Sequence, residues 1–184
     1  MVKSKPVPFK TLVAALLNDQ EPFPPRYLHR FSDLIDEDSQ ALIQAWPKVS
    51  PARRVALLED LDELNQADDL LSFEEVCKLA LKDAQAQVRL LGVKILKEYE
   101  LPQYISNFIQ MAKHDHDGEV RAAAAGALGN FTYLGEVDKI HPSTHQRIEE
   151  ALLSILNSKD ESIVRRRALE ALGYSSREEV KPAI

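Results

Sequence analysis

The sequence predicts an all-α protein, an α-α superhelix in which paired helices stack as a solenoid. Apolar side chains recur at helical spacing along one face, and the stripe that begins at Val88 returns 32 residues later at Val120. Each striped helix follows another striped helix by a nearly constant step of 15 or 16 residues. The 184 residues are 45% hydrophobic and include only six glycines, which suits packed helices better than a barrel or a sandwich.

The chain divides into two predicted parts, an irregular helical N-terminal segment at residues 1–47 and a repeat region at residues 48–184. The irregular part is expected to contain short helices at about 9–17, 27–35 and 39–46. Ser50 and Pro51 predict the start of a longer helix that reaches about residue 64, because serine caps helices well and proline is favoured at the first helical position. This helix and the one before it form a degenerate first repeat.

Three further repeats carry the clearest stripes. The second helices contain Val88, Leu91, Gly92, Ile95, Leu96 and Tyr99; Val120, Ala123, Ala124, Ala127, Leu128 and Phe131; and Val164, Ala168, Ala171 and Leu172. The first helices contain Phe73, Val76, Cys77 and Ala80; Ile105, Phe108, Ile109 and Ala112; and Ile148, Ala151, Leu152 and Ile155. Offsets of three and four residues place each set on one helix face, so these residues are the predicted core.

An acidic turn joins the two helices of each repeat, as at Asp115 and Asp117. Aspartate in this position can cap the following helix and interacts favourably with its N-terminal dipole. A valine–arginine pair follows in every copy, at Val88-Arg89, Val120-Arg121 and Val164-Arg165. The valine is expected in the core. The arginine is expected to reach an aspartate of a neighbouring turn, so that stacked repeats form an Asp–Arg ladder.

The pattern Asp-x-Asp-x-x-Val-Arg-x-x-Ala-x-x-x-Leu-Gly is complete from Asp115 to Gly129, and it resembles a HEAT repeat. The similarity is greatest to short HEAT-like repeats of the phycobilisome-lyase type, and it covers roughly residues 72–184. Gly129 and Gly173 match the glycine that ends the second helix, whereas Lys97 replaces it in the first copy. The resemblance implies a right-handed solenoid of HEAT-like hairpins, with second helices lining a concave surface that binds a protein.

Two stretches depart from the regular spacing. About a dozen extra residues at 132–147 predict a surface loop, and Ser143 is the expected cap of the following helix. The binding face is the alternative location for such an insertion. Near the C-terminus, Val180, Ala183 and Ile184 match the start of another first helix, so the last repeat is predicted to be incomplete. We interpret this end as a shortened chain, or as a surface covered by a partner or a second copy.

The composition argues against several classes of function. A net charge of −6 argues against nucleic acid as the main partner, because proteins that hold a phosphate backbone usually carry a basic face. The single cysteine, Cys77, excludes an internal disulfide and any zinc site that needs two cysteines from this chain. The sequence has no apolar run near 18 residues and no signal peptide, which predicts no membrane contact and a cytoplasmic location.

Some side-chain clusters resemble chemical sites, but each has a simpler structural interpretation. The residues at 114–117 alternate in direction along a turn, and a predicted helix start separates His141 from His145. Cys77 lies on a buried stripe, where a thiol is inert. We therefore predict no catalytic residue, no cofactor-binding residue and no metal ligand.

The favoured hypothesis is a protein-interaction scaffold that binds a protein partner on its helical-repeat surface and performs no catalysis of its own. The residues predicted to contact the partner are Lys94, Lys97, Arg166, Tyr133 and Leu134. Two alternatives remain open: a phycobilin-lyase-like, enzyme-associated HEAT protein, and a HEAT-fold nucleic-acid-binding protein. The identity of the partner and the oligomeric state are left open by the sequence.

Overall fold

The computed structural model describes residues 7–178 and residue 180. These residues form α-helices and 3-10 helices, and no strand occurs in this part of the chain. The chain contains two compact units, Met1–Ile95 and Leu96–Ile184. The predicted all-α fold class is confirmed.

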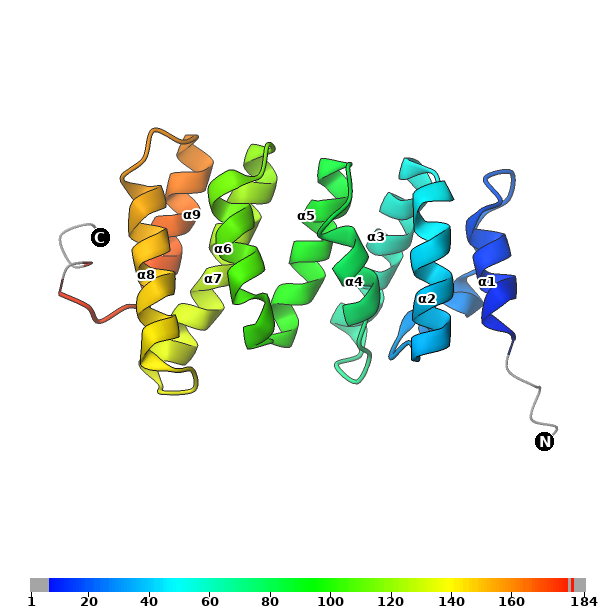
Figure 1. Cartoon of the computed structure of the whole chain (residues 1–184), viewed down its shortest axis with the longest axis horizontal. Helices are drawn as coiled ribbons and strands as arrows, with labels where there is room; N and C mark the ends of the chain where they lie inside the picture. Colours follow the sequence, from blue (N-terminus) through cyan, green and yellow to red (C-terminus); the bar gives the residue numbers. More distant parts are fainter. Residues whose placement is uncertain (1–6, 179, 181–184) are drawn as a thin grey trace. The chain divides into compact units, whose positions relative to one another are not determined.

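The first unit begins with short helices and continues with longer ones. Its elements are α1 (Phe9–Leu16), η1 (Pro25–Phe31), α2 (Asp36–Ala45), η2 (Trp46–Lys48), α3 (Pro51–Ala67), α4 (Glu74–Ala80) and α5 (Ala86–Leu96), where η denotes a 3-10 helix and Leu96 already belongs to the second unit (Figure 1). The helices expected at 9–17 and 39–46 are confirmed to within a few residues. The helix expected at 27–35 is instead the 3-10 helix η1, because the chain becomes extended at Ser32 and turns at Asp33, whose φ of 50° is left-handed.

Aromatic side chains hold the N-terminal elements together. The Phe31 ring is 1% exposed, and its centroid lies 5.7 Å from that of Phe9 and 5.9 Å from that of Phe23. Edge-to-face aromatic contacts add to the large apolar area that such rings bury. The irregular segment therefore packs as part of the first unit's core.

Local interactions set the start of α3 and the spacing of α4 and α5. The Ser50 hydroxyl accepts a hydrogen bond from the Arg53 amide at 3.3 Å, which confirms the predicted cap. A Cβ added at Gly92 would lie 2.8 Å from the Cβ of Ala80. Glycine at this position therefore allows α5 to approach α4 closely.

The second unit is a two-layer arrangement of helices. It contains η3 (Lys97–Tyr99), η4 (Pro102–Tyr104), α6 (Ile105–His114), α7 (Gly118–Glu136), α8 (Pro142–Leu156) and α9 (Ser162–Leu172). The first helices α6 and α8 contact each other and form one layer, and the second helices α7 and α9 form the other (Figure 1). Each first helix also contacts its own second helix, as expected of stacked helical hairpins.

The repeat register predicted from the apolar stripes is confirmed. Val88, Val120 and Val164 occupy matching positions near the starts of α5, α7 and α9, and each is 0% exposed. In the second unit, Phe108 of α6 and Phe131 of α7 are also fully buried, with ring centroids 6.1 Å apart. Each hairpin thus buries its apolar stripe within a helical core.

The predicted Asp–Arg ladder is confirmed at Arg121. Its Nη2 lies 2.7 Å from Oδ1 of Asp160, and its Nε lies 3.0 Å from Oδ2. Asp160 precedes the second helix of the next hairpin, and Arg121 also donates to the Asp115 carbonyl in its own turn at 2.8 Å. The hydrogen bonds from Arg121 lower the pKa of Asp160, and those to Asp160 raise the pKa of Arg121. This paired arginine ties α7 to the following acidic turn.

A second rung of the ladder, which the sequence analysis did not identify, lies in the first unit. Arg54 Nη1 of α3 lies 2.7 Å from Oδ2 of Asp83, in the turn between α4 and α5. The same oxygen accepts a hydrogen bond from Trp46 Nε1 at 2.8 Å, and Oδ1 accepts one from the Gln85 amide at 2.9 Å. The Asp83 side chain is 0% exposed, so this carboxylate depends on its three donors for solvation.

The stretch at 132–147 is mostly helical, and the predicted surface loop is confined to residues 137–141. Helix α7 continues to Glu136, so Gly129 lies inside the helix and does not end it. A Cβ at Gly129 would lie 3.3 Å from Ala171, which indicates that glycine serves close helix packing there. His141, and not Ser143, caps α8, because its side chain accepts a hydrogen bond from the Ser143 amide.

Two further features concern the end of the described chain and its relation to membranes. Gly173 directly follows α9, as predicted, and Val180 is 0% exposed in a turn. Ala183 and Ile184, the other residues of the expected next helix, lie outside the described residues. Among the helices of the described chain, none combines the length and the apolar character needed to cross a bilayer.

Candidate functional site

The two predicted lysine contacts belong to different units. Lys94 is exposed on α5 in the first unit. Lys97 is half-buried in η3 of the second unit, and its Nζ lies 3.2 Å from an Oε1 atom of Glu98. Each lysine is therefore accessible within its own unit.

The predicted contacts at Tyr133 and Leu134 have opposite environments, because adjacent residues on a helix point in different directions. Tyr133 is 50% exposed, whereas Leu134 is 7% exposed and offers little surface to a partner. The Tyr133 ring lies edge-on to Tyr174, which follows α9 and is 57% exposed, with ring centroids 6.1 Å apart. Two large aromatic side chains thus meet at the solvent-exposed ends of α7 and α9.

Arg166 is exposed on α9, and its neighbour Arg167 faces α7. The Nε of Arg166 lies 3.6 Å from Glu170, and the Nη1 of Arg167 lies 2.7 Å from the other carboxylate oxygen of the same residue. A Cβ added at Gly126 would lie 3.9 Å from Cδ of Arg167. One carboxylate therefore serves two arginines along this face.

These observations define a surface on α7, α9 and the turn after α9, called here the α7–α9 face. Its members are Tyr133, Arg166, Arg167, Glu170 and Tyr174. Helices α7 and α9 approach closely at Gly129, which presents no side chain to Ala171. The face combines exposed aromatic rings with arginines, a residue set that is enriched at protein-binding hot spots.

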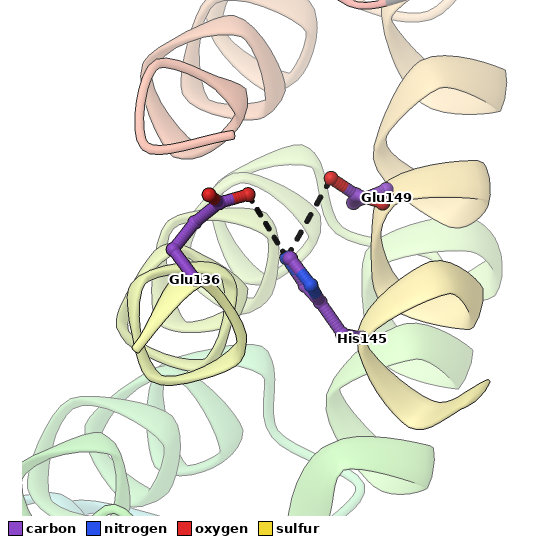
Figure 2. Close-up of side chains that lie close together, drawn as sticks. All are labelled: Glu136, His145 and Glu149. Carbon is purple, nitrogen blue, oxygen red and sulfur yellow. Dashed lines mark ion pairs between the residues drawn. The ribbon is translucent and has the colours of Figure 1, made fainter. Parts of the chain in front are cut away.

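A second cluster lies on another part of the same unit and joins α7 to α8. Figure 2 shows Glu136 at the end of α7 and His145 and Glu149 on α8, with the imidazole between the two carboxylates. The Nε2 atom of His145 lies 3.7 Å from Oε1 of Glu136 and 3.5 Å from Oε1 of Glu149. Nε2 is buried and has no hydrogen-bond partner among the described residues. We call these three residues the Glu–His–Glu cluster.

The backbone of α7 makes room for the imidazole ring. A Cβ added at Gly135 would lie 2.2 Å from Cγ of His145 and 2.3 Å from Cδ2. Such distances are far below van der Waals contact, so any larger residue at 135 would displace the ring. Gly135 thus permits the position of His145 beside Glu136.

The segment that follows α9 supplies hydrogen bonds to both carboxylates. Ser176 donates to Glu136 from its amide at 2.9 Å and from its hydroxyl at 2.6 Å. The Ser175 hydroxyl donates to Oε1 of Glu149, and Nη1 of Arg177 lies 3.6 Å from Oε2. Burial alone would raise the pKa of Glu136, but the Ser176 hydrogen bonds and the nearby His145 lower it below its ordinary value. Both carboxylates are therefore held in place by a third segment of chain.

The sequence analysis considered His145 only as a possible partner of His141 and missed this cluster. In the structure His141 caps α8, and His145 faces the two glutamates. The spacing of His145 and Glu149, four residues apart, was a usable signal once both lie on one helix. The position of Glu136 could not be predicted from the sequence, because it depends on the turn that reverses the chain between α7 and α8.

Comparison with known families identifies the type of repeat. Residues 73–142 match the family model described as HEAT repeats. The matched segment, which is less than half of the chain, is similar to HEAT repeats. It begins at Phe73, just before α4, and ends at the start of α8, so it includes two acidic turns and Arg121, whereas Asp160, the partner of Arg121 in the ladder, lies beyond it. A comparison with curated proteins found no match.

Proposed function

We propose that this chain is a protein-interaction scaffold, without catalysis of its own, whose α7–α9 face binds a protein partner. The observation that carries the proposal is the exposed pair Tyr133 and Tyr174, at 50% and 57% exposure, the first on α7 and the second in the turn directly after α9. Exposed neighbouring tyrosines can supply a large contact area at a small cost in conformational entropy. HEAT repeats generally mediate protein interactions, which supports a binding role.

The charges of the α7–α9 face favour a partner segment that carries acidic residues. Arg166 and Arg167 share the single carboxylate of Glu170, so this part of the face has an excess of positive charge. Arginine beside an aromatic ring can bind a carboxylate through two parallel hydrogen bonds and can stack on other planar groups. The rings provide the apolar contact, and the arginines select the charge of the partner.

The proposal is tested by affinity capture from a lysate of the source organism, with bound proteins identified by mass spectrometry. The variant Tyr133→Ala with Tyr174→Ala is compared with wild type and with Val137→Ala, a control at a residue that is 41% exposed in the turn after α7. A partner of the α7–α9 face is captured by wild type and by the control, and its yield falls at least tenfold with the double variant. Equal capture by all three proteins refutes this face as the binding surface.

A phycobilin-lyase-like role remains the alternative hypothesis that the finer sequence resemblance suggests. Mixing the chain with a linear tetrapyrrole and recording the absorption spectrum tests it. A shifted band that saturates at one bilin per chain favours this alternative over the scaffold, and an unchanged spectrum removes it. The cytoplasmic location is part of the proposal and is tested by cell fractionation. The absence of catalysis is also part of the proposal, and the identity of the captured partner tests it.

A further inference from the structure

We propose that the Glu–His–Glu cluster binds a divalent first-row transition-metal ion, with Zn²⁺ as the representative ion. Glu136 and Glu149 would each provide a carboxylate oxygen, and His145 would provide Nε2. The potential ligand atoms of all three residues lie within 4.8 Å of one another. The cluster shares no residue with the α7–α9 face, so the proposal does not depend on the proposed function.

The distances suit a small ion with short metal–ligand bonds. Zinc binds imidazole nitrogen and carboxylate oxygen at about 2.0–2.2 Å, which places two tetrahedral ligands about 3.4 Å apart. The Nε2 atom of His145 is already 3.5 Å from one carboxylate oxygen and 3.7 Å from the other. Coordination therefore needs only small side-chain adjustments.

The state of His145 Nε2 provides an observation independent of the carboxylates. This nitrogen is buried, and none of the described residues hydrogen-bonds to it, although a carboxylate lies on each side of the imidazole. Most buried polar nitrogens have a partner. A metal ion between the three groups gives this nitrogen a partner, and Gly135 leaves the room that the ring needs.

The groups around the cluster resemble an outer shell of metal-site hydrogen bonds. Ser175 and Ser176 donate to the two carboxylates, and Arg177 lies beside Oε2 of Glu149, the oxygen farther from the proposed ion. Outer hydrogen bonds of this kind orient ligating carboxylates. The formal charge of the two glutamates exceeds that of Arg177 by one negative unit, and a cation bound between them offsets that excess.

The ligand types select the class of metal ion. Imidazole is a good ligand for zinc, copper, iron and nickel, whereas magnesium and calcium prefer sites made only of oxygen. Two carboxylates and one imidazole therefore favour a first-row transition ion over Mg²⁺. The ion would join the end of α7, the start of α8 and the segment after α9, and it would stabilise this edge of the second unit.

The test measures Zn²⁺ binding to the full chain by isothermal titration calorimetry, and Co²⁺ coordination by visible absorption. Wild type should bind one Zn²⁺, and His145→Gln should weaken binding at least tenfold. The matched control is His116→Gln, which removes an exposed imidazole from the turn between α6 and α7. The control should retain wild-type affinity, and Mg²⁺ should produce no binding signal.

If circular dichroism shows that His145→Gln does not fold, a second variant keeps the test decisive. Glu136→Gln alters a carboxylate whose side chain is 23% exposed, and it should also weaken Zn²⁺ binding at least tenfold. The proposal is overturned if wild type binds no Zn²⁺, if the cluster variants bind as tightly as wild type, or if His116→Gln abolishes binding. The last result would place the ion at the turn between α6 and α7.

Discussion

Removing the buried Asp83 carboxylate should destabilise the first unit more than removing the partly exposed carboxylate of Asp38 does. Asp83→Ala takes away the acceptor of Arg54 and Trp46 at distances of 2.7 and 2.8 Å. The Arg54 side chain is only 12% exposed, so its charge loses its partner in a poorly solvated position. Breaking a buried ion pair from one side costs about 3–5 kcal/mol, and partial access of water to Arg54 places the expected loss at about 3 kcal/mol.

The assay is urea unfolding followed by fluorescence of Trp46, the only tryptophan in the chain. With a denaturant slope of about 2 kcal/mol per molar, a loss of about 3 kcal/mol lowers the unfolding midpoint by about 1.5 M. The control is Asp38→Ala, which removes a pair with Arg30 at 3.4 Å whose side chains are 21% and 37% exposed. Such a surface pair contributes about 1 kcal/mol or less. Equal midpoints for the two variants would refute the reasoning.

Three further predictions concern the rung at Arg121, the helix contact at Gly92 and the buried thiol. Because Arg121 lowers the pKa of Asp160, the pair stabilises the fold above the unfolded carboxyl pKa of about 4 and loses that effect as the pH falls through the lower folded pKa. Asp160→Asn should therefore show a shallower loss of stability between about pH 5 and 2 in acid-unfolding curves, and an unchanged slope would contradict this. Gly92→Ala places a methyl 2.8 Å from the Ala80 Cβ and should cost about 1–3 kcal/mol in urea unfolding; a neutral result would show that α4 and α5 can separate freely. Burial raises the pKa of the Cys77 thiol, which is 0% exposed, so the native chain should not react with a thiol reagent at pH 8 that reacts at once in urea.

The repeat register was predictable because it depends on local spacing. The stripes beginning at Val88, Val120 and Val164 identify core positions with no knowledge of neighbouring helices, and all three valines are buried. The acidic turns are equally local, since Asp117 accepts hydrogen bonds from the second and third amides after it, from Glu119 and Val120. Patterns of this kind reflect helix geometry alone.

Contacts between segments were harder to predict. The Arg54 rung was missed because its helix has arginine before valine, the reverse of the order at Val120-Arg121. Its position is nevertheless equivalent, since Arg54 lies four residues after its cap Ser50, as Arg121 lies four residues after Asp117. Spacing from the cap is therefore a better indicator of a ladder arginine than the dipeptide.

The Glu–His–Glu cluster was not predictable for a different reason. It requires α7 to continue to Glu136, a short turn to reverse the chain, and residues 175–177 to return beside both glutamates. The sequence indicated a loop at 132–147, where the structure has the end of one helix and the start of the next. Sites formed by three separate segments depend on tertiary packing, which apolar periodicity does not specify.

Photo-crosslinking tests the binding role of the α7–α9 face most directly. A photoreactive amino acid replaces Tyr133 in cells of the source organism, and a matched chain carries it in place of Leu17, which is 40% exposed at the end of α1. The account predicts one discrete protein adduct from position 133 that is absent from position 17 and is lost when Arg166 and Arg167 are both changed to glutamate. No adduct, or the same adducts from both positions, would contradict it.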